Sequence, residues 1–378
     1  MYYITVKQSP RYHQMSLEEF LFGPDTAPRE PSVRTSDTRT YCVEDVSQRF
    51  WNMYDLLRIN RKLADFNQKY AALRDADRHS LYREFYIPKK SGGLRKIDAP
   101  NDELMNALRE LKLIFENDCR ALYHTSAFAY IHGRCTVDCV RRHQSNESKW
   151  FGKYDLSNFF GSTTLDFVMN MLSMVFPFSH LIRVQSYERE LRTALSLAFL
   201  DGGLPQGTPI SPLITNLMMI PVDYLLSNKL RDYNGQHFVY TRYADDFHIS
   251  SRYTFQYREI EALLRDTLAA FGAPFHINES KTRYGSSAGR NWMLGVMLNK
   301  DNQVTVGHQN KKRFMRMLES FVMDIQNHIP WDISDVQVME GLRSYYTMVE
   351  GETITRIITY INQKHNVNTL TLIKSALS

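Results

Sequence analysis

The chain has 378 residues, which is long enough for two or three subdomains with separate hydrophobic cores. Its net charge of +5 permits nucleic-acid binding without requiring it, and its hydrophobic fraction of 43% is ordinary for a soluble protein. No apolar run approaches the ~20 residues of a membrane span, and the first residues lack the apolar core of a signal peptide. Together with four dispersed cysteines, which do not suggest a disulfide framework, these features predict a cytoplasmic protein with no membrane partner.

The first predicted elements follow a long irregular start. Residues 1–50 are polar and contain several prolines, which predicts an N-terminal extension with little core of its own. Apolar residues at helical spacing predict helices over 51–80 and 101–122. Between these helices, β-prone runs at 84–87 and 94–97 flank a Gly-rich turn, which predicts a hairpin.

The remaining elements lie between residue 150 and the C-terminus. A β-prone run over 150–156 predicts a strand that carries Asp155 near its end. The elements predicted after it are helices over 164–175, 186–200 and 211–231, a hairpin over 237–251, a helix over 255–271, a hairpin over 292–306 and helices over 308–365. The last region is basic and is predicted to break near Pro330 and Gly351.

Three carboxylates are the candidates for chemistry. Asp245 and Asp246 lie at the predicted tip of the 237–251 hairpin, and Asp155 ends another strand. Neighbouring side chains on a strand point to opposite faces, so an adjacent pair reaches one site only if that site lies at the tip. An acidic pair in a turn is usually part of a solvated loop. Two divalent cations at a phosphoryl-transfer site need a third acid from another strand, and Asp155 is the candidate for it.

Two further features suit a nucleic-acid substrate. The segment 203–212 is a Gly- and Pro-rich turn that opens a predicted helix, and backbone N–H groups in such a place suit phosphate or sugar contact. Basic residues cluster at 89–96, 134–143 and 311–316, and 22 Tyr and 21 Phe offer surfaces on which bases stack. Each basic cluster taken alone is more often a solvated face.

The order of these blocks resembles that of bacterial reverse transcriptases, the group that includes retron and group II intron enzymes. The resemblance runs from about Glu84 to Asn299. The motifs that carry it are the hairpin at 84–97, the strand with Asp155, Leu204-Pro205-Gln206-Gly207, Tyr243-Ala244-Asp245-Asp246, Asn278 with Lys281-Thr282, and Leu294-Gly295. Six such blocks in one order are not expected by chance.

The resemblance implies an α/β (α+β) fold of the right-hand polymerase type, with fingers, palm and thumb. The palm would be a small antiparallel sheet backed by helices, and the thumb would be helical. The implied domains are an N-terminal extension at 1–50, fingers at 51–150, a palm at 151–306 with a helical insertion of the fingers at about 164–200, and a thumb at 307–378.

The resemblance also implies a role for individual residues. Asp155, Asp245 and Asp246 would be the catalytic, metal-binding carboxylates, and the Leu156 carbonyl would lend one ion a further oxygen. Phe160 would be a steric gate that clashes with a 2′-hydroxyl. The implied nucleotide-binding residues are Lys89, Lys90, Arg95, Phe160, Gln206 and Lys281. The implied primer- and template-binding residues are Gly133, Arg134, Tyr243, Leu294 and Gly295.

Without the resemblance, several of these residues have plainer interpretations. Phe160 at a strand end would normally belong to the core, and Gln206 could cap the helix that follows it. Lys281 in a loop is usually solvated, and Gly295 could serve only to permit a hairpin kink.

The implied reaction is RNA-directed DNA polymerisation, in which a primer 3′-hydroxyl attacks the α-phosphate of a dNTP. The implied cofactors are two Mg²⁺ ions, with Mn²⁺ as the alternative. The implied partners are an RNA template, for which a dedicated structured RNA is a candidate, the DNA product and dNTPs. The alternatives are a template-independent nucleotidyl transferase, an RNA-dependent RNA polymerase and, in a different class, a non-catalytic RNA-binding scaffold.

The chain also departs from its relatives. Residues 139–143 keep only His143 of the Asn-Ala-x-x-His signature of retron enzymes, and residues 293–295 replace their Val-Thr-Gly. About 70 residues follow the implied palm, which is too few for the splicing domain of group II intron enzymes. These departures favour a compact standalone reverse transcriptase, with a role in phage defence as one candidate.

A zinc site is a competing interpretation of the segment around residue 140. His132, Cys135, Cys139 and His143 carry spacings that zinc ligands sometimes have. Zinc ligands more often come as Cys-x2-Cys with a separated second pair, and helical periodicity explains this stretch without a metal. The sequence therefore favours the interpretation without zinc.

Overall fold

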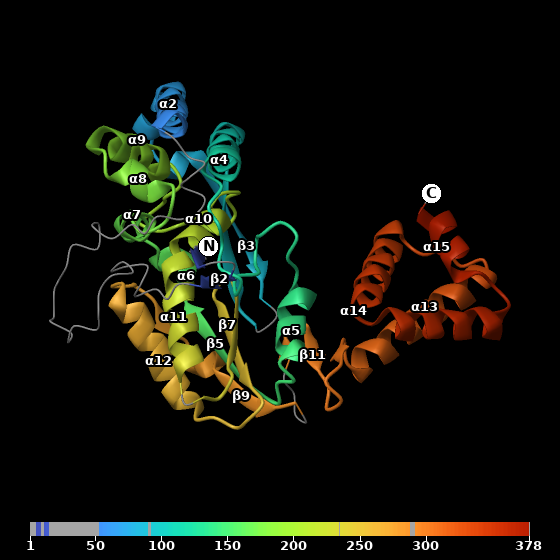
Figure 1. Cartoon of the computed structure of the whole chain (residues 1–378). Coiled ribbons are helices and arrows are strands. Elements are labelled where there is room, and N and C mark those ends of the chain that lie inside the picture. Colours follow the sequence, from blue (N-terminus) through green and yellow to red (C-terminus); the bar gives the residue numbers. More distant parts are fainter. Residues whose placement is uncertain are drawn as a thin grey trace. The chain divides into compact units, whose positions relative to one another are not determined.

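The computed structural model of the chain describes residues 5–8, 11–14, 53–89, 92–233, 235–287 and 292–377 (Figure 1). Apart from the short strands β1 (Thr5–Gln8) and β2 (Arg11–Gln14), the predicted N-terminal extension lies outside the described residues. The chain forms two compact units, each discontinuous in sequence. The first unit is Met1–Arg134, Gly152–Ile249 and Gln256–Arg283, and the second unit is Cys135–Phe151, Ser250–Phe255 and Tyr284–Ser378.

The first unit begins with a helical region that supports a hairpin. The elements here are α2 (Met53–Lys69), α3 (Ala71–Asp75), the 3₁₀ turn η3 (His79–Leu81), β3 (Tyr82–Pro88), β4 (Leu94–Pro100), α4 (Asp102–Ile114) and the π-turn η4 (Phe115–Cys119). The side chain of Asn101 accepts a hydrogen bond from the Leu104 amide at 2.9 Å, as expected for an N-cap residue. β3 and β4 form the predicted antiparallel hairpin.

A second group of helices covers residues 159–232. It comprises α6 (Phe159–Ser162), α7 (Leu165–Leu172), α8 (Phe178–Ile182), α9 (Gln185–Ser196), α10 (Ser211–Met218) and α11 (Ile220–Asp232). α9 packs against α2, α7 and α8. The single helix predicted over 211–231 is wrong in one respect, because the chain breaks at Met219 and Pro221 lies in the first turn of α11. Proline suits a first turn but disrupts a helix interior.

A five-stranded sheet has most of its residues in the first unit. It contains β5 (Trp150–Ser157), β6 (Val239–Tyr243), β7 (Asp246–Ser251), β8 (His276–Ile277) and β9 (Arg283–Ser286). The order is β6-β7-β5-β8, with β9 also paired to β5, and β5 runs antiparallel to β8. α11 packs on β6 and on α12 (Tyr257–Ala270). The predicted class, a small antiparallel sheet backed by helices, is confirmed.

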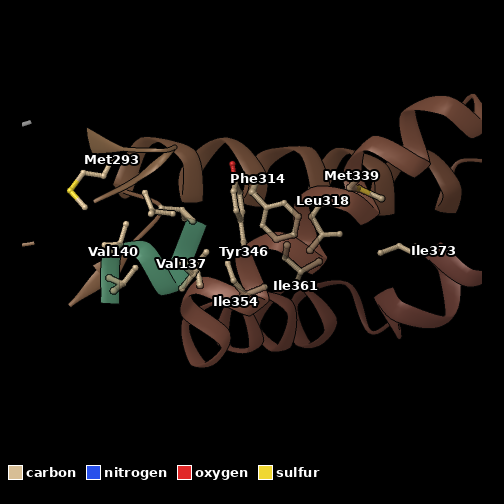
Figure 2. Packing of buried hydrophobic residues seen from close by; sticks show 14 of the residues in the cluster. Val137, Val140, Met293, Phe314, Leu318, Met339, Tyr346, Ile354, Ile361 and Ile373 are labelled. Atoms are coloured by element: carbon tan, nitrogen blue, oxygen red, sulfur yellow. The ribbon is translucent and has the colours of Figure 1, made fainter. Parts of the chain in front are cut away.

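The second unit is mostly helical and has its own core. Its elements are α5 (Thr136–Ser145), the strands β10 (Trp292–Met293), β11 (Val296–Leu298) and β12 (Val304–Thr305), and the helices α13 (His308–Gln326), α14 (Ile333–His365) and α15 (Thr369–Leu377). Figure 2 shows apolar side chains of α5 and of the C-terminal helices in one buried cluster. The three strands form a meander. The structure therefore has one strand more than the two-stranded hairpin predicted over 292–306.

Both breaks predicted in the C-terminal region are confirmed. α13 ends at Gln326 and α14 begins at Ile333, on either side of Pro330. Within α14, Glu350 has non-helical angles (φ −137°, ψ 57°) next to Gly351. Among the described residues, no helix combines the length and the apolar character needed to cross a lipid bilayer.

Candidate active site

The predicted carboxylates lie together at one end of strands β5, β6 and β7. Ala244 and Asp245 form the two-residue turn between β6 and β7, and Ala244 adopts a positive φ of 56°. The Leu156 amide of β5 donates to the Asp245 carbonyl oxygen at 3.2 Å, so the tip of the hairpin lies beside the end of β5. Asp155 precedes Leu156 on that strand. The three acids therefore lie together, although Asp155 is distant in sequence from Asp245 and Asp246.

Two lysines contact these acids. Lys281 Nζ lies 2.9 Å from Asp155 Oδ2, and Lys153 Nζ lies 2.9 Å from Asp246 Oδ2. Lys281 was predicted at the site, whereas Lys153 was missed. A signal for Lys153 was available, because residues two apart on a strand share a face, and Lys153 precedes Asp155 by two.

The electrostatics of the site show an excess of buried negative charge. Burial, followed by the charges of Asp246 and Asp155, raises the pKa of Asp245 from its ordinary 3.8 to about 6. The hydrogen bond with Asp155 raises the pKa of Lys281, and the charges of Asp245 and Asp246 act in the same direction. Carboxylates that are held together repel one another unless cations lie between or beside them.

The donor set fits a divalent ion that prefers oxygen. Asp246 Oδ1 is buried and has no hydrogen-bond partner, although its other oxygen contacts Lys153. Over the described residues, no group of three or more His, Cys, Asp or Glu side chains is arranged as a preformed metal site. An ion bound by Asp155 and Asp246 would replace the lysine contacts that these two carboxylates make here. Carboxylate and carbonyl oxygens are the ligands that Mg²⁺ prefers.

The Gly- and Pro-rich segment 203–212 is hydrogen-bonded both to strand β4 of the hairpin and to α6. The Asp98 amide of β4 donates to the Gln206 carbonyl at 2.8 Å, and the Leu204 amide donates to the Phe160 carbonyl at 3.0 Å. Phe160 is half-buried and its ring lies edge-on to that of Phe159, with centroids 5.6 Å apart. The loop thus connects the backbone of Phe160 to that of β4 through Leu204 and Gln206, the last of which is, like Phe160, a predicted nucleotide-binding residue.

The predicted basic residues of the hairpin are only partly described. Lys89 is exposed, and its amide donates to the Gly93 carbonyl at 2.9 Å, which closes the turn. Arg95 is also exposed, and its charge acts on the phenol of Tyr130. Lys90 lies outside the described residues.

Tyr130 lies beside the candidate site and was not among the predicted residues. Its ring centroid lies 6.5 Å from that of Tyr243, the residue before the Ala244–Asp245 turn. Burial, and then the charge of Asp245, raise the pKa of Tyr130, whereas the charge of Arg95 lowers it. The side chain is nevertheless 54% exposed. Tyr130 has a positive φ of 57°, which is rare for a bulky residue and which no local sequence pattern indicates.

The predicted template and primer residues fall into both units. In the first unit, Arg134 Nη1 donates to the carbonyls of His124 and Ala127 at 2.7 and 2.5 Å, so this side chain braces its own loop. In the second unit, Leu294 and Gly295 form the turn between β10 and β11, with φ of 54° and 89°. Their template- and primer-binding roles, together with that of Gly133, stay predictions.

Two side chains of the competing zinc interpretation, those of Cys135 and His143, contact other residues. Cys135 Sγ lies 3.1 Å from Asp138 Oδ2, and Cys139 is buried. His143 Nδ1 lies 2.6 Å from Ser250 Oγ.

Comparison with known proteins bears directly on the family. The sequence model of the reverse transcriptase (RNA-dependent DNA polymerase) family matches residues 87–315 of the chain. The retron Ec73 reverse transcriptase of Escherichia coli is 27% identical over 62% of this chain and 74% of its own length. The retron Ec83 enzyme of Escherichia coli is 26% identical over 78% of this chain and 89% of its own length. The retron Mx65 enzyme of Myxococcus xanthus is 26% identical over 76% and 66%.

Solved structures of telomerase are also similar to the chain. Telomerase from Candida albicans in complex with a fragment of telomeric RNA is 13% identical, with a TM-score of 0.42 over 78% of this chain. Apo telomerase from Candida tropicalis is 13% identical, with a TM-score of 0.43 over 78% of this chain. The chain spans 58% and 61% of the lengths of these two proteins.

The family match covers more than half of the chain and includes all three carboxylates. Retron enzymes are among the matched proteins even though residues 139–143 and 293–295 depart from the retron pattern. The predicted family and enzyme class are therefore confirmed. Members of the family generally use divalent metal ions. The chain belongs to the reverse transcriptase family, whose members are RNA-dependent DNA polymerases.

Proposed function

We propose that the chain extends a primer 3′-hydroxyl with dNTPs by two-metal phosphoryl transfer, directed by an RNA template. The observation that carries the proposal is that Asp155, near the end of β5, lies beside Asp245 and Asp246 at the turn between β6 and β7. Buried Asp246 Oδ1, which has no protein partner, supports the same conclusion. We further propose Mg²⁺ as the physiological ion, with Mn²⁺ as the alternative.

In this proposal each side chain has a defined task. When bound, two Mg²⁺ ions would supply electrostatic stabilisation at the attacking and leaving oxygens and lower the pKa of the primer hydroxyl. Asp155, Asp245 and Asp246 hold the ions, and the Leu156 carbonyl lends one further oxygen. Lys281, which contacts Asp155 here, would be close enough to pair with the pyrophosphate as it leaves.

The neighbouring residues would bind and select the nucleotide. Gln206 contacts the incoming dNTP, and Lys89, Lys90 and Arg95 of the hairpin pair with its triphosphate. Phe160 excludes a 2′-hydroxyl by steric contact. The domains follow the sequence analysis, with fingers, palm and thumb as proposed divisions of the chain.

The first test removes two of the acids. Asp245→Asn with Asp246→Asn should abolish DNA synthesis on a primed RNA template, because neutral amides bind divalent ions far more weakly than carboxylates. Circular dichroism and thermal unfolding should show an intact fold. The matched control is Asp266→Asn, an exposed acid on α12 that should leave synthesis unchanged. Full synthesis by the double variant would refute the assignment of the acids.

A second test separates the polymerase alternatives. Phe160→Ala should raise incorporation of ribonucleotides relative to deoxynucleotides, because the ring would no longer contact the 2′ position. Single-nucleotide extension with dNTP and rNTP pairs measures this ratio. An unchanged ratio would favour a different gate or an RNA polymerase, and extension without any template would favour a terminal transferase. No extension by the wild-type protein would favour the RNA-binding scaffold.

The biological partners belong to the proposal as well. We propose a dedicated structured RNA as the template, a DNA product, a cytoplasmic location and a role in phage defence. The exposed basic residues Lys312, Arg313 and Arg316 of α13 would hold such an RNA by its phosphates. Sequencing the nucleic acid that copurifies with the protein tests this. A random mixture of cellular RNA would contradict a dedicated template.

A further inference from the structure

A buried ion pair lies directly behind the catalytic turn. The side chains of Arg242 and Asp223 are both 0% exposed. Arg242 Nε and Nη2 donate to the two oxygens of Asp223 at 2.7 Å each. Tyr240 donates its hydroxyl to Asp223 Oδ1 at 2.6 Å, so both oxygens of this carboxylate have partners.

The remaining arm of the guanidinium reaches the turn itself. Arg242 Nη1 donates to the carbonyl oxygen of Ala244 at 3.1 Å and to Asn216 Oδ1 at 3.1 Å. Ala244 is the turn residue with positive φ, and it precedes Asp245. A single side chain thus connects α11, through Asp223, to the backbone that presents two catalytic carboxylates.

The same network extends to the segment that carries Tyr130. Asn216 Nδ2 of α10 donates to the Ala129 carbonyl at 2.5 Å. On the backbone, the Arg242 amide donates to the Ser126 carbonyl at 2.7 Å, and the Phe128 amide donates to the Arg242 carbonyl at 2.9 Å. The catalytic turn and residues 126–130 are therefore held by common partners.

The chemistry of arginine explains why this residue is suited to the position. Desolvation of two charges opposes a buried ion pair, and well-packed apolar residues often stabilise a fold equally well. The presence of the pair is therefore weak evidence that its role is to stabilise the fold. The planar guanidinium, in contrast, presents donors at fixed angles and can hold a carboxylate, an amide and a carbonyl at once. A lysine carries the same charge but offers one nitrogen on a flexible stem.

We propose that Arg242, with Asp223 and Asn216, is a positioning network that fixes the Ala244–Asp245 turn relative to residues 126–130. Arg242 does not touch substrate and acts through the turn. This inference rests on the proposed polymerase function for its kinetic consequence. Its structural consequence, coupled order of the two segments, does not depend on activity.

The test measures the rate per active molecule. A pre-steady-state burst of dNTP incorporation gives both the fraction of active enzyme and the rate constant of that fraction. Arg242→Lys should lower the burst rate constant about 10-fold or more, since small misplacements of catalytic groups have effects of up to ~100-fold. Asn216→Leu, which removes no charge, should lower the burst rate constant as well.

The matched control breaks a buried carboxylate contact elsewhere in the first unit. Lys62→Met removes the 2.8 Å contact of Lys62 with Asp118, whose side chain is 7% exposed. This variant should lower the melting temperature and the active fraction but not the burst rate constant. If Arg242→Lys and Asn216→Leu behave in the same way as this control, the network is merely structural and the proposal is wrong. If Arg242→Lys does not fold, Asn216→Leu decides the matter.

Hydrogen exchange gives the readout that is independent of catalysis. Asn216→Leu should accelerate exchange at residues 126–130 and at 243–246 together, and should leave α9 unchanged. Exchange that accelerates at one segment alone would overturn the inference. A wild-type protein without dNTP incorporation would refute the proposed function, and the coupled exchange would still decide whether the network exists.

Discussion

Asp245 is a residue whose ionisation should couple the stability of the metal-free protein to pH. Its pKa is about 6 in the folded chain, against an ordinary 3.8. Because the folded pKa is the higher one, folding favours the protonated acid, and this contribution is fully present below about pH 4. It is lost as the pH rises to about 6. Above that pH, burial and the charges of Asp246 and Asp155 destabilise the ionised carboxylate of Asp245 in the folded chain.

This predicts a pH-dependent difference between wild type and Asp245→Asn. Denaturant unfolding in EDTA should show wild type losing stability relative to the variant between about pH 4 and 6, because the amide has no charge to bury. Adding Mg²⁺ at neutral pH should restore wild type more than the variant. A difference in unfolding free energy that stays constant from pH 4 to 7 would contradict the raised pKa.

At the scale of elements, the Gly- and Pro-rich loop packs closely against α6 at Gly203. A Cβ on Gly203 would lie 2.2 Å from the carbonyl oxygen of Gly161, a distance that no relaxed side chain accepts. The contact sets the loop against the helix that carries Phe160, while Gln206 on the other side is bonded to β4. Glycine at 203 is therefore required by packing.

Gly203→Ala should consequently weaken both the fold and nucleotide binding. We expect a loss of about 1–3 kcal/mol in unfolding free energy, because overpacked positions force the backbone to shift. The KM for dNTP should rise, since Phe160 and Gln206 would move apart. Gly341→Ala is the control, as this glycine lies exposed in α14 with nothing within 4 Å of the added Cβ. It should stabilise the protein by about 0.5–1 kcal/mol. Equal effects of the two substitutions would exclude the packing explanation.

The elements also show how far the sequence could predict the site. Asn101 before a run of helical spacing was a readable start signal, and the carboxylates at the 237–251 tip followed from two β-prone runs. Arg242 was not predictable, because a charged residue on a strand usually faces solvent and its partner Asp223 lies on another element. Local patterns report faces and ends of elements, whereas pairing between elements depends on tertiary packing.

At the scale of the whole molecule, the second unit combines segments that are far apart in sequence. Val137 and Val140 of α5 belong to the same buried cluster as Phe314 and Leu318 of α13 (Figure 2). The resemblance implied one domain at 51–150 and another at 307–378. An amphipathic helix such as α5 shows that it has an apolar face, but its sequence does not state which element covers that face.

A shared core predicts shared stability, and one substitution can measure it. Leu318 is fully buried in α13, so Leu318→Ala should destabilise the second unit by about 2–5 kcal/mol. If α5 belongs to the cooperative core, native-state hydrogen exchange should accelerate in residues 136–145 as well as in α13 and α14. α9 of the first unit should keep its protection. Met323→Ala is the control, because this α13 side chain is 47% exposed and its loss should change exchange little. Protection of α5 that survives Leu318→Ala would show that this helix is stabilised without the C-terminal helices.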